Sequence, residues 1–139
     1  MANLAQEIVI TLDIHASPAR VYAAFTRPEG WCAWCCEKAE SDARLGGRLH
    51  IYTEGYNAYG EFIELEPARS VTFTWNGDRE PPMIIHVRLA EIGDNTRLTF
   101  KVNGLGTEQA WTGIVDFLER IWGHVLNNLK SVLEAKPEL

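Results

Sequence analysis

The longest hydrophobic pattern in this chain lies in its last third, between Thr107 and about Lys136. Apolar residues recur there at steps of three and four, which is typical of a single buried stripe on an amphipathic helix. Because a helix of this length extends roughly 40 Å, only a broad curved sheet could cover its apolar face. The stripe consists of Trp111, Ile114, Val115, Leu118, Ile121, Trp122, Val125, Leu129, Val132 and Leu133.

Most of the chain before this helix follows the period of two that is typical of strands. In residues 7–15 one face carries Ile8, Ile10, Leu12 and Ile14, and the other carries Val9, Thr11, Asp13 and His15. Further strands are predicted after Gly46-Gly47 and at residues 59–65, 71–75, 83–89 and 98–102, and we count about seven in all. A helix gripped by such a sheet tends to enclose a cavity, so we expect an α+β domain that either binds a small molecule or is associated with a chaperone.

Two short helical segments are predicted between the first two strands. Ser17 followed by Pro18 supplies an N-cap and a first-turn proline, which predicts a helix through Phe25 that Pro28 ends. A second helical segment is predicted from Glu29 to Cys36.

Composition fits one packed domain over residues 1–139, since 46% of the residues are apolar and 23% are charged. The formal net charge is −6 and the lysines and arginines are scattered, so no basic stripe is present to bind a phosphate backbone. A nucleic-acid partner is therefore not expected.

The N-terminal residues alternate like a strand and do not resemble a signal peptide. No apolar run approaches the ~20 residues that span a bilayer, so no membrane partner is expected. Three cysteines crowded between positions 32 and 36 are typical of free thiols in a reducing compartment. We therefore expect a cytoplasmic protein without a cofactor.

Several motifs follow one another in a fixed order over nearly the whole chain, and each is weak alone. They are Ser17-Pro18-Ala19-Arg20-Val21-Tyr22 with Phe25, Arg27-Pro28-Glu29 before Trp34, Gly46-Gly47, Tyr59-Gly60-Glu61-Phe62-Ile63-Glu64-Leu65-Glu66-Pro67 running into Val71-Thr72-Phe73-Thr74-Trp75, Asn95-Thr96-Arg97-Leu98-Thr99-Phe100, and the late run Trp122, Leu126, Leu129 and Leu133. Together they resemble the family named for the activator of the heat-shock-protein-90 ATPase, within the START-like, birch-pollen-allergen-like helix-grip superfamily.

The resemblance implies a curved antiparallel sheet of six or seven strands, short helices after the first strand, and a long C-terminal helix that closes an apolar cavity. The superfamily includes lipid carriers, hormone receptors, cyclases and chaperone activators, and this chain resembles its stand-alone bacterial members. Chaperone activation belongs to larger relatives with an additional N-terminal domain, for which this sequence has no room. Two departures from the family pattern, Ile121 and Val102, suggest an unusually apolar cavity.

The predicted ligand cavity is lined by apolar and aromatic residues of the strands, the second helical segment and the last helix. They are Trp31, Trp34, Cys35, Leu49, Ile51, Phe73, Trp75, Ile85, Val87, Phe100, Val102, Trp111, Val115, Leu118 and Trp122. Aromatic residues at this spacing are more often plain core, so the cavity itself rests on the fold analogy. Its ligand would be a small apolar or aromatic molecule.

Catalytic residues are not specified by the sequence. All four histidines fall on the polar faces of their elements, outside the expected cavity. In the segment at residues 59–65 the apolar residues do not show which face is buried, because Ile63 and Leu65 favour one face and Phe62 favours the other. Either Glu61 or Glu64 could therefore face inward, where burial would raise its pKa and make it a candidate acid. Tyr59 is a further weak candidate. Exposed carboxylates are the commoner alternative.

The thiols are expected to be small apolar wall residues. Cys32 and Cys35 have the spacing of a dithiol pair, but no second ligand pair completes a zinc site, and no metal is expected.

Three functions are therefore open. The first is noncatalytic binding of a small hydrophobic ligand. The second is an enzyme of the cyclase, hydrolase or dehydratase kind acting on an aromatic or polyketide-like substrate. The third is an interaction module of the chaperone-associated or stress-response kind that contacts a chaperone or forms a homodimer through exposed strand edges.

Overall fold

The computed structural model describes residues 7–78, 82–104 and 115–135 of the chain. Seven strands and three helices are described in these ranges. The strands are β1 (Glu7–Ile14), β2 (Lys38–Ser41), β3 (Arg48–Thr53), β4 (Tyr56–Glu66), β5 (Ser70–Gly77), β6 (Met83–Ile92) and β7 (Asn95–Gly104), and the helices are α1 (Pro18–Thr26), α2 (Pro28–Cys32) and α4 (Val115–Ala135).

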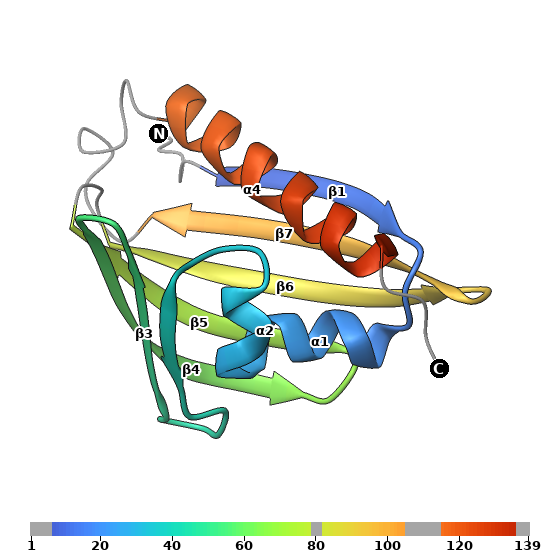
Figure 1. Ribbon diagram of the computed structural model, residues 1–139, viewed down its shortest axis with the longest axis horizontal. Coiled ribbons are helices and arrows are strands. Elements are labelled where there is room, and N and C mark those ends of the chain that lie inside the picture. Colours follow the sequence, from blue (N-terminus) through green and yellow to red (C-terminus); the bar gives the residue numbers. More distant parts are fainter. Residues whose placement is uncertain (1–6, 79–81, 105–114, 136–139) are drawn as a thin grey trace, which may run out of the picture.

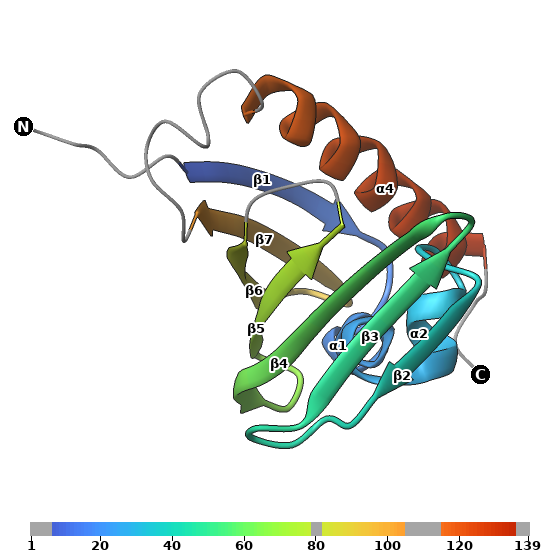
Figure 2. The ribbon, with the colours of Figure 1, turned by 90° about the vertical axis from the view of Figure 1, so that its left-hand side faces the viewer.

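The strands form one antiparallel sheet in the order β1-β7-β6-β5-β4-β3-β2. The sheet curves strongly, and all three helices lie on its concave side (Figure 1). Seen from the side, α4 runs along β1, while α1 and α2 lie between α4 and the far strands β2 to β4 (Figure 2). This arrangement confirms the predicted helix-grip architecture.

The predicted faces of the strands are observed. In β1, Ile8 and Ile14 are buried and face the helices, and the polar positions between them are exposed. Ser17 caps α1 as predicted, because its hydroxyl accepts a hydrogen bond from the backbone N–H of Arg20.

Two short elements differ from the prediction. The helix α2 ends at Cys32 and residues 33–35 form a turn, so it is shorter than the predicted segment from Glu29 to Cys36. The strand β2 was not predicted, because Lys38-Ala39-Glu40-Ser41 has no apolar alternation. It is an edge strand that pairs only with β3, so it needs little apolar surface.

A structural irregularity explains why the sequence of residues 59–65 does not show which face of the strand is buried. The register between β4 and β5 shifts between Phe62 and Glu64, which is the mark of a β-bulge. Phe62 is therefore buried on one side of the bulge and Leu65 is half-buried on the other, while Ile63 between them is exposed. Two apolar residues separated by an odd number of positions can thus face the same core.

The helix α4 buries a stripe made of Leu118, Trp122, Leu126, Leu129 and Leu133. The prediction was wrong for Ile121, whose residue surface is 44% exposed. Its neighbour Trp122 points into the core, and adjacent helical positions differ by about 100° around the axis. Ile121 therefore does not make the interior more apolar. The predicted Trp111, Ile114 and the cap Thr107 lie outside the described residues.

Hydrogen bonds join the C-terminal part of α4 to the end of β1. The ammonium of Lys130 donates to the carbonyl oxygen of Asp13 at 2.6 Å. The carboxylate of Glu134 accepts hydrogen bonds from Lys130 at 2.7 Å and from the backbone N–H of His15 at 2.9 Å. We call this set of contacts the α4 latch. No described helix is long and apolar enough to cross a membrane.

Candidate ligand site

The interior between the sheet and the helices is an aromatic cluster. Trp31 is fully buried and its ring stacks on that of Trp34, with centroids 5.4 Å apart and planes 20° apart. Edge-on contacts join Trp31 to Phe73 at 5.6 Å and Trp75 to Trp122 at 5.2 Å. The preferred edge-to-face and offset geometries show that these rings are packed against one another.

Most of the predicted cavity residues lie in this interior. Trp31, Trp34, Leu49, Ile51, Phe73, Trp75, Ile85, Val87, Phe100, Val102, Leu118 and Trp122 are buried. Cys35 and Val115 are half-buried and pack against the same core, and Trp111 lies outside the described residues. The side chains are therefore brought together, but their contacts with one another occupy much of the space between them.

One polar atom in this cluster has no partner among the described residues. The indole N–H of Trp31 is buried and donates no hydrogen bond there. Leaving a buried donor unsatisfied costs about 1–3 kcal/mol. An acceptor atom placed beside this ring would remove that penalty.

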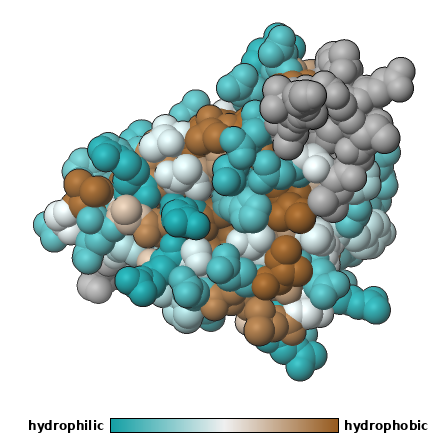
Figure 3. Space-filling view, turned by 180° about the vertical axis from the view of Figure 1, so that it is seen from behind, coloured by the Kyte–Doolittle hydropathy of each residue, from teal (hydrophilic) through white to brown (hydrophobic). Residues whose placement is uncertain are grey.

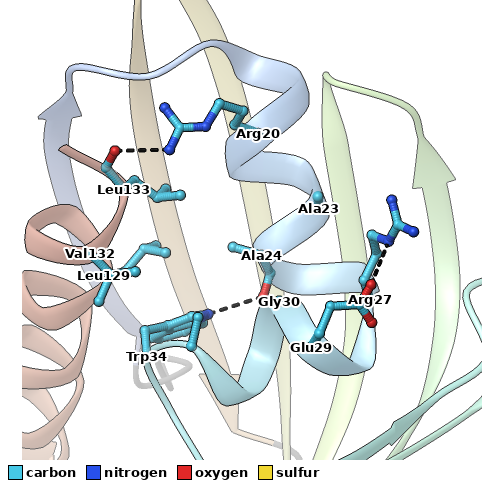
Figure 4. Close-up of a pocket in the computed structure, with 11 residues that line it drawn as sticks. Arg20, Ala23, Ala24, Arg27, Glu29, Gly30, Trp34, Leu129, Val132 and Leu133 are labelled. Atoms are coloured by element: carbon cyan, nitrogen blue, oxygen red, sulfur yellow. Dashed lines mark hydrogen bonds and ion pairs between the residues drawn. The ribbon is translucent and has the colours of Figure 1, made fainter. Parts of the chain in front are cut away.

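A groove of about 330 Å³ opens beside the cluster, between α1, α2 and α4 (Figure 4). We call it the helix groove. Trp34 lies at its base, and Leu129, Val132 and Leu133 of α4 form one wall. The opposite wall comes from α1, α2 and the turn after α2, and it consists of small residues, namely Ala23, Ala24, Gly30 and Ala33.

Close packing of α1 on α2 shapes the small-residue wall. A Cβ at Gly30 would collide with the carbonyl oxygen of Ala23, so only glycine allows this approach. The indole N–H of Trp34 donates to the carbonyl oxygen of Ala24 at 3.0 Å. This bond fixes the orientation of the ring at the base of the groove.

Charged groups lie at the rim of the helix groove. Arg20 donates from Nη2 to the carbonyl oxygen of Leu133 at 3.0 Å, which ties α1 to the end of α4. Arg27 pairs with Glu29 across 3.1 Å, and both side chains are mostly exposed. Among the residues that the structure describes, these three are the only charged side chains that line the groove, and none of the described lining residues is a histidine or cysteine that could transfer a proton or act as a nucleophile.

The weak catalytic candidates lie elsewhere. Tyr59, Glu61 and Glu64 are all exposed, and they belong to the outer face of the sheet. Glu64 accepts a hydrogen bond from Thr72 at 3.0 Å, and the Tyr59 ring stacks on His50 at 4.4 Å. Neither carboxylate reaches the interior, because Glu61 alternates with the buried Phe62 next to it and the bulge after Phe62 turns Glu64 outward.

The histidines also avoid the interior, as predicted. His15 and His124 are exposed, while His50 and His86 are half-buried on the outer face, at strand positions that alternate with buried residues. Burial lowers the pKa of His86, and the nearby Lys101 acts in the same direction. Seen from behind, this outer face mixes hydrophilic residues with scattered hydrophobic ones (Figure 3).

The three cysteines are free thiols. The sulfur atoms of Cys32 and Cys36 lie 3.6 Å apart, so the two thiols in contact are four residues apart and are not the pair with dithiol spacing, Cys32 and Cys35. Burial raises the pKa of the Cys35 thiol to about 12. Within the described ranges, no group of three or more metal-ligating side chains comes together.

A curved seven-stranded antiparallel sheet that holds a long C-terminal helix defines a START-like, helix-grip domain. The family model described as "Activator of Hsp90 ATPase homolog 1-like protein" matches residues 15–134. The chain therefore belongs to that family. Among curated proteins, no match was found.

Solved structures share the fold. A protein from Mesorhizobium loti has a TM-score of 0.80 at 20% identity, with 96% of this chain and 100% of that chain covered. The Aha1 dimer of Colwellia psychrerythraea has a TM-score of 0.81 at 21% identity, covering 93% of this chain and 96% of that chain. CalU16 from Micromonospora echinospora has a TM-score of 0.76 at 26% identity, covering 93% and 76%.

Proposed function

We propose that this chain binds a small, mainly apolar or aromatic molecule in the helix groove and the aromatic interior behind it. The observation that carries this proposal is the composition of the groove, in which the leucines and valine of α4 face small α1 and α2 residues above the Trp34 ring. Its volume of about 330 Å³ is at the lower end of the range for small-molecule sites, which begins near 300 Å³.

The unsatisfied indole N–H of Trp31 supports the same proposal. Trp31 lies directly beside Trp34, whose ring forms the base of the groove. Trp31 does not itself line the groove, so a ligand with a ketone, ester or ether oxygen would gain a hydrogen bond to it only by entering the interior behind Trp34. The proposed ligand is therefore an apolar molecule with one acceptor oxygen.

Catalysis is not part of this proposal. An acid for the enzyme hypothesis would have to be a desolvated Glu61 or Glu64, and both carboxylates are exposed. The charged groups of the groove are two arginines and one glutamate that pairs with Arg27.

Binding can be tested with the neutral fluorescent probe N-phenyl-1-naphthylamine. Ala23→Phe should fill the groove and weaken binding of the probe by about tenfold or more. Ala90→Phe makes the same chemical change at an exposed position of β6, on the outer face of the sheet, and should leave the affinity unchanged. Val132→Asp, which adds charge to the wall with little added volume, should act like Ala23→Phe.

Two results would contradict this function. The wild-type protein could fail to bind the probe, or both groove variants could bind it with wild-type affinity while thermal unfolding shows them to be folded.

A second proposal is self-association. Val9 on the edge strand β1 is 48% exposed, and Ile63 of β4 is 44% exposed on the outer face. The Colwellia psychrerythraea relative is described as a dimer, and a Plasmodium falciparum relative as an HSP90 activator. Light scattering over a concentration series should show a mass that rises to twice that of the chain, and a constant monomer mass would contradict self-association.

We further propose a cytoplasmic location, which the three free thiols support.

A further inference from the structure

We propose that Cys32 and Cys36 form a modification site, a dithiol that a hydroperoxide oxidises to an intramolecular disulfide. The inference concerns a different chemistry from ligand binding in the helix groove and does not depend on it. It rests on which two of three neighbouring cysteines the fold brings together.

The geometry of the two thiols is the first argument. Their sulfur atoms lie 3.6 Å apart, and a disulfide bond needs an approach to about 2.05 Å. Cys32 is the last residue of α2, and Cys36 follows the turn at residues 33–35, just before β2. Closing the bond therefore requires a rearrangement of side-chain torsions and of this turn.

Access to a small oxidant is the second argument. Cys32 lines two open surface depressions. One, of about 700 Å³, is also lined by Lys38, His50 and Tyr52. The other, of about 400 Å³, is also lined by Cys35, Cys36 and Asn128. A hydroperoxide in either depression therefore lies against Cys32.

The roles of the three thiols differ because their surroundings differ. Burial keeps the Cys35 thiol protonated at neutral pH, and a protonated thiol is a poor nucleophile. Burial and the adjacent Cys32 also raise the pKa of Cys36. Cys32 lines both depressions, whereas the other two thiols line only one, so Cys32 is the thiol that attacks the peroxide. Cys36 is the thiol that resolves the product, because its sulfur lies 3.6 Å from that of Cys32.

The reaction balances in two steps. The sulfur of Cys32 attacks the O–O bond, which gives a sulfenic acid at Cys32 and releases the alcohol, or water when the oxidant is hydrogen peroxide. The sulfur of Cys36 then attacks the Cys32 sulfur, an S–S bond forms, and the hydroxyl leaves as water with the Cys36 proton. The two thiols lose two electrons, and the peroxide accepts them.

The test is oxidation of the reduced, folded chain with hydrogen peroxide, followed by intact mass measurement and non-reducing peptide mapping. The expected product has lost two hydrogens and contains a Cys32–Cys36 bond. Cys35→Ser should form the same bond at a similar rate. Cys32→Ser should slow the consumption of peroxide by about tenfold or more, and Cys36→Ser should stop at oxygenated Cys32.

A denatured sample gives a control that does not depend on any variant. In denaturant the preference for the 32–36 pair should disappear, because the fold no longer holds the two sulfurs together. The proposal is overturned if the folded wild-type protein forms a bond that includes Cys35, or accumulates oxygenated Cys32 while Cys36 remains a free thiol. It is also overturned if the thiols of the folded chain do not react while those of the denatured chain do.

Discussion

Gly123 lies inside α4, between the buried Trp122 and the exposed His124. A Cβ built at this position meets no described atom within 4 Å, apart from the backbone of the helix and the adjoining residues. A close helix contact therefore does not require glycine here, and Gly123→Ala adds a methyl group without a clash.

The expected effect is an increase in stability. Glycine in a helix interior is less favourable than alanine by about 0.5–1 kcal/mol, mainly because the unfolded glycine has more backbone freedom. For a chain of this size, that difference corresponds to a rise in melting temperature of about 2–4 °C. The m-value should stay the same, since the exposed surface hardly changes.

Urea denaturation followed by tryptophan fluorescence measures this difference. Gly60→Ala is the matched control, because a Cβ at Gly60 would collide with the carbonyl oxygen of Thr74 on the neighbouring strand. That variant should be less stable than the wild type. A Gly123→Ala protein that is also less stable would refute the reasoning, because it would mean that this face of α4 packs closely against another surface.

Three further predictions concern packing, pH and the groove. Leu126→Ala, at a fully buried position of α4, should lower the free energy of unfolding by about 2–5 kcal/mol in urea denaturation. A loss below about 1 kcal/mol would mean that this face of α4 is not packed on the sheet. In the α4 latch, the hydrogen bonds from Lys130 and His15 lower the pKa of Glu134 below its ordinary value of 4.5. The latch should therefore stabilise the protein fully above that pH and progressively less as pH falls through the folded-state pKa, and Glu134→Gln should reduce this loss in acid titrations of stability. Gly30→Ala should weaken both stability and probe binding, measured by thermal unfolding and fluorescence titration, and unchanged values would contradict the tight α1–α2 contact.

Hydrophobic periodicity predicted the sheet and the long helix because each buries one continuous face. It failed for Ile121, which was assigned to the buried stripe because it is apolar and lies next to Trp122 in the sequence. Adjacent residues point about 100° apart around a helix, so Ile121 is exposed while Trp122 is buried. It also failed for β2, whose polar residues form an edge strand held mainly by backbone hydrogen bonds to β3.

The candidate site was harder to predict than the fold. The aromatic residues of the interior alternate along their strands, so their inward direction could be predicted. The helix groove depends on Ala23, Gly30 and Ala33, which are small residues without a pattern and come together only when α1 packs on α2. The Cys32–Cys36 contact depends on where α2 ends, which the sequence placed about four residues too late.

Binding in the helix groove is tested most directly by nuclear Overhauser effects between N-phenyl-1-naphthylamine and the methyl groups of the protein. The account predicts cross-peaks from the probe to Ala23, Leu129 and Val132, which line the groove from opposite sides. Cross-peaks confined to methyl groups of the outer sheet face, such as those of Val9 and Ile63, would contradict it.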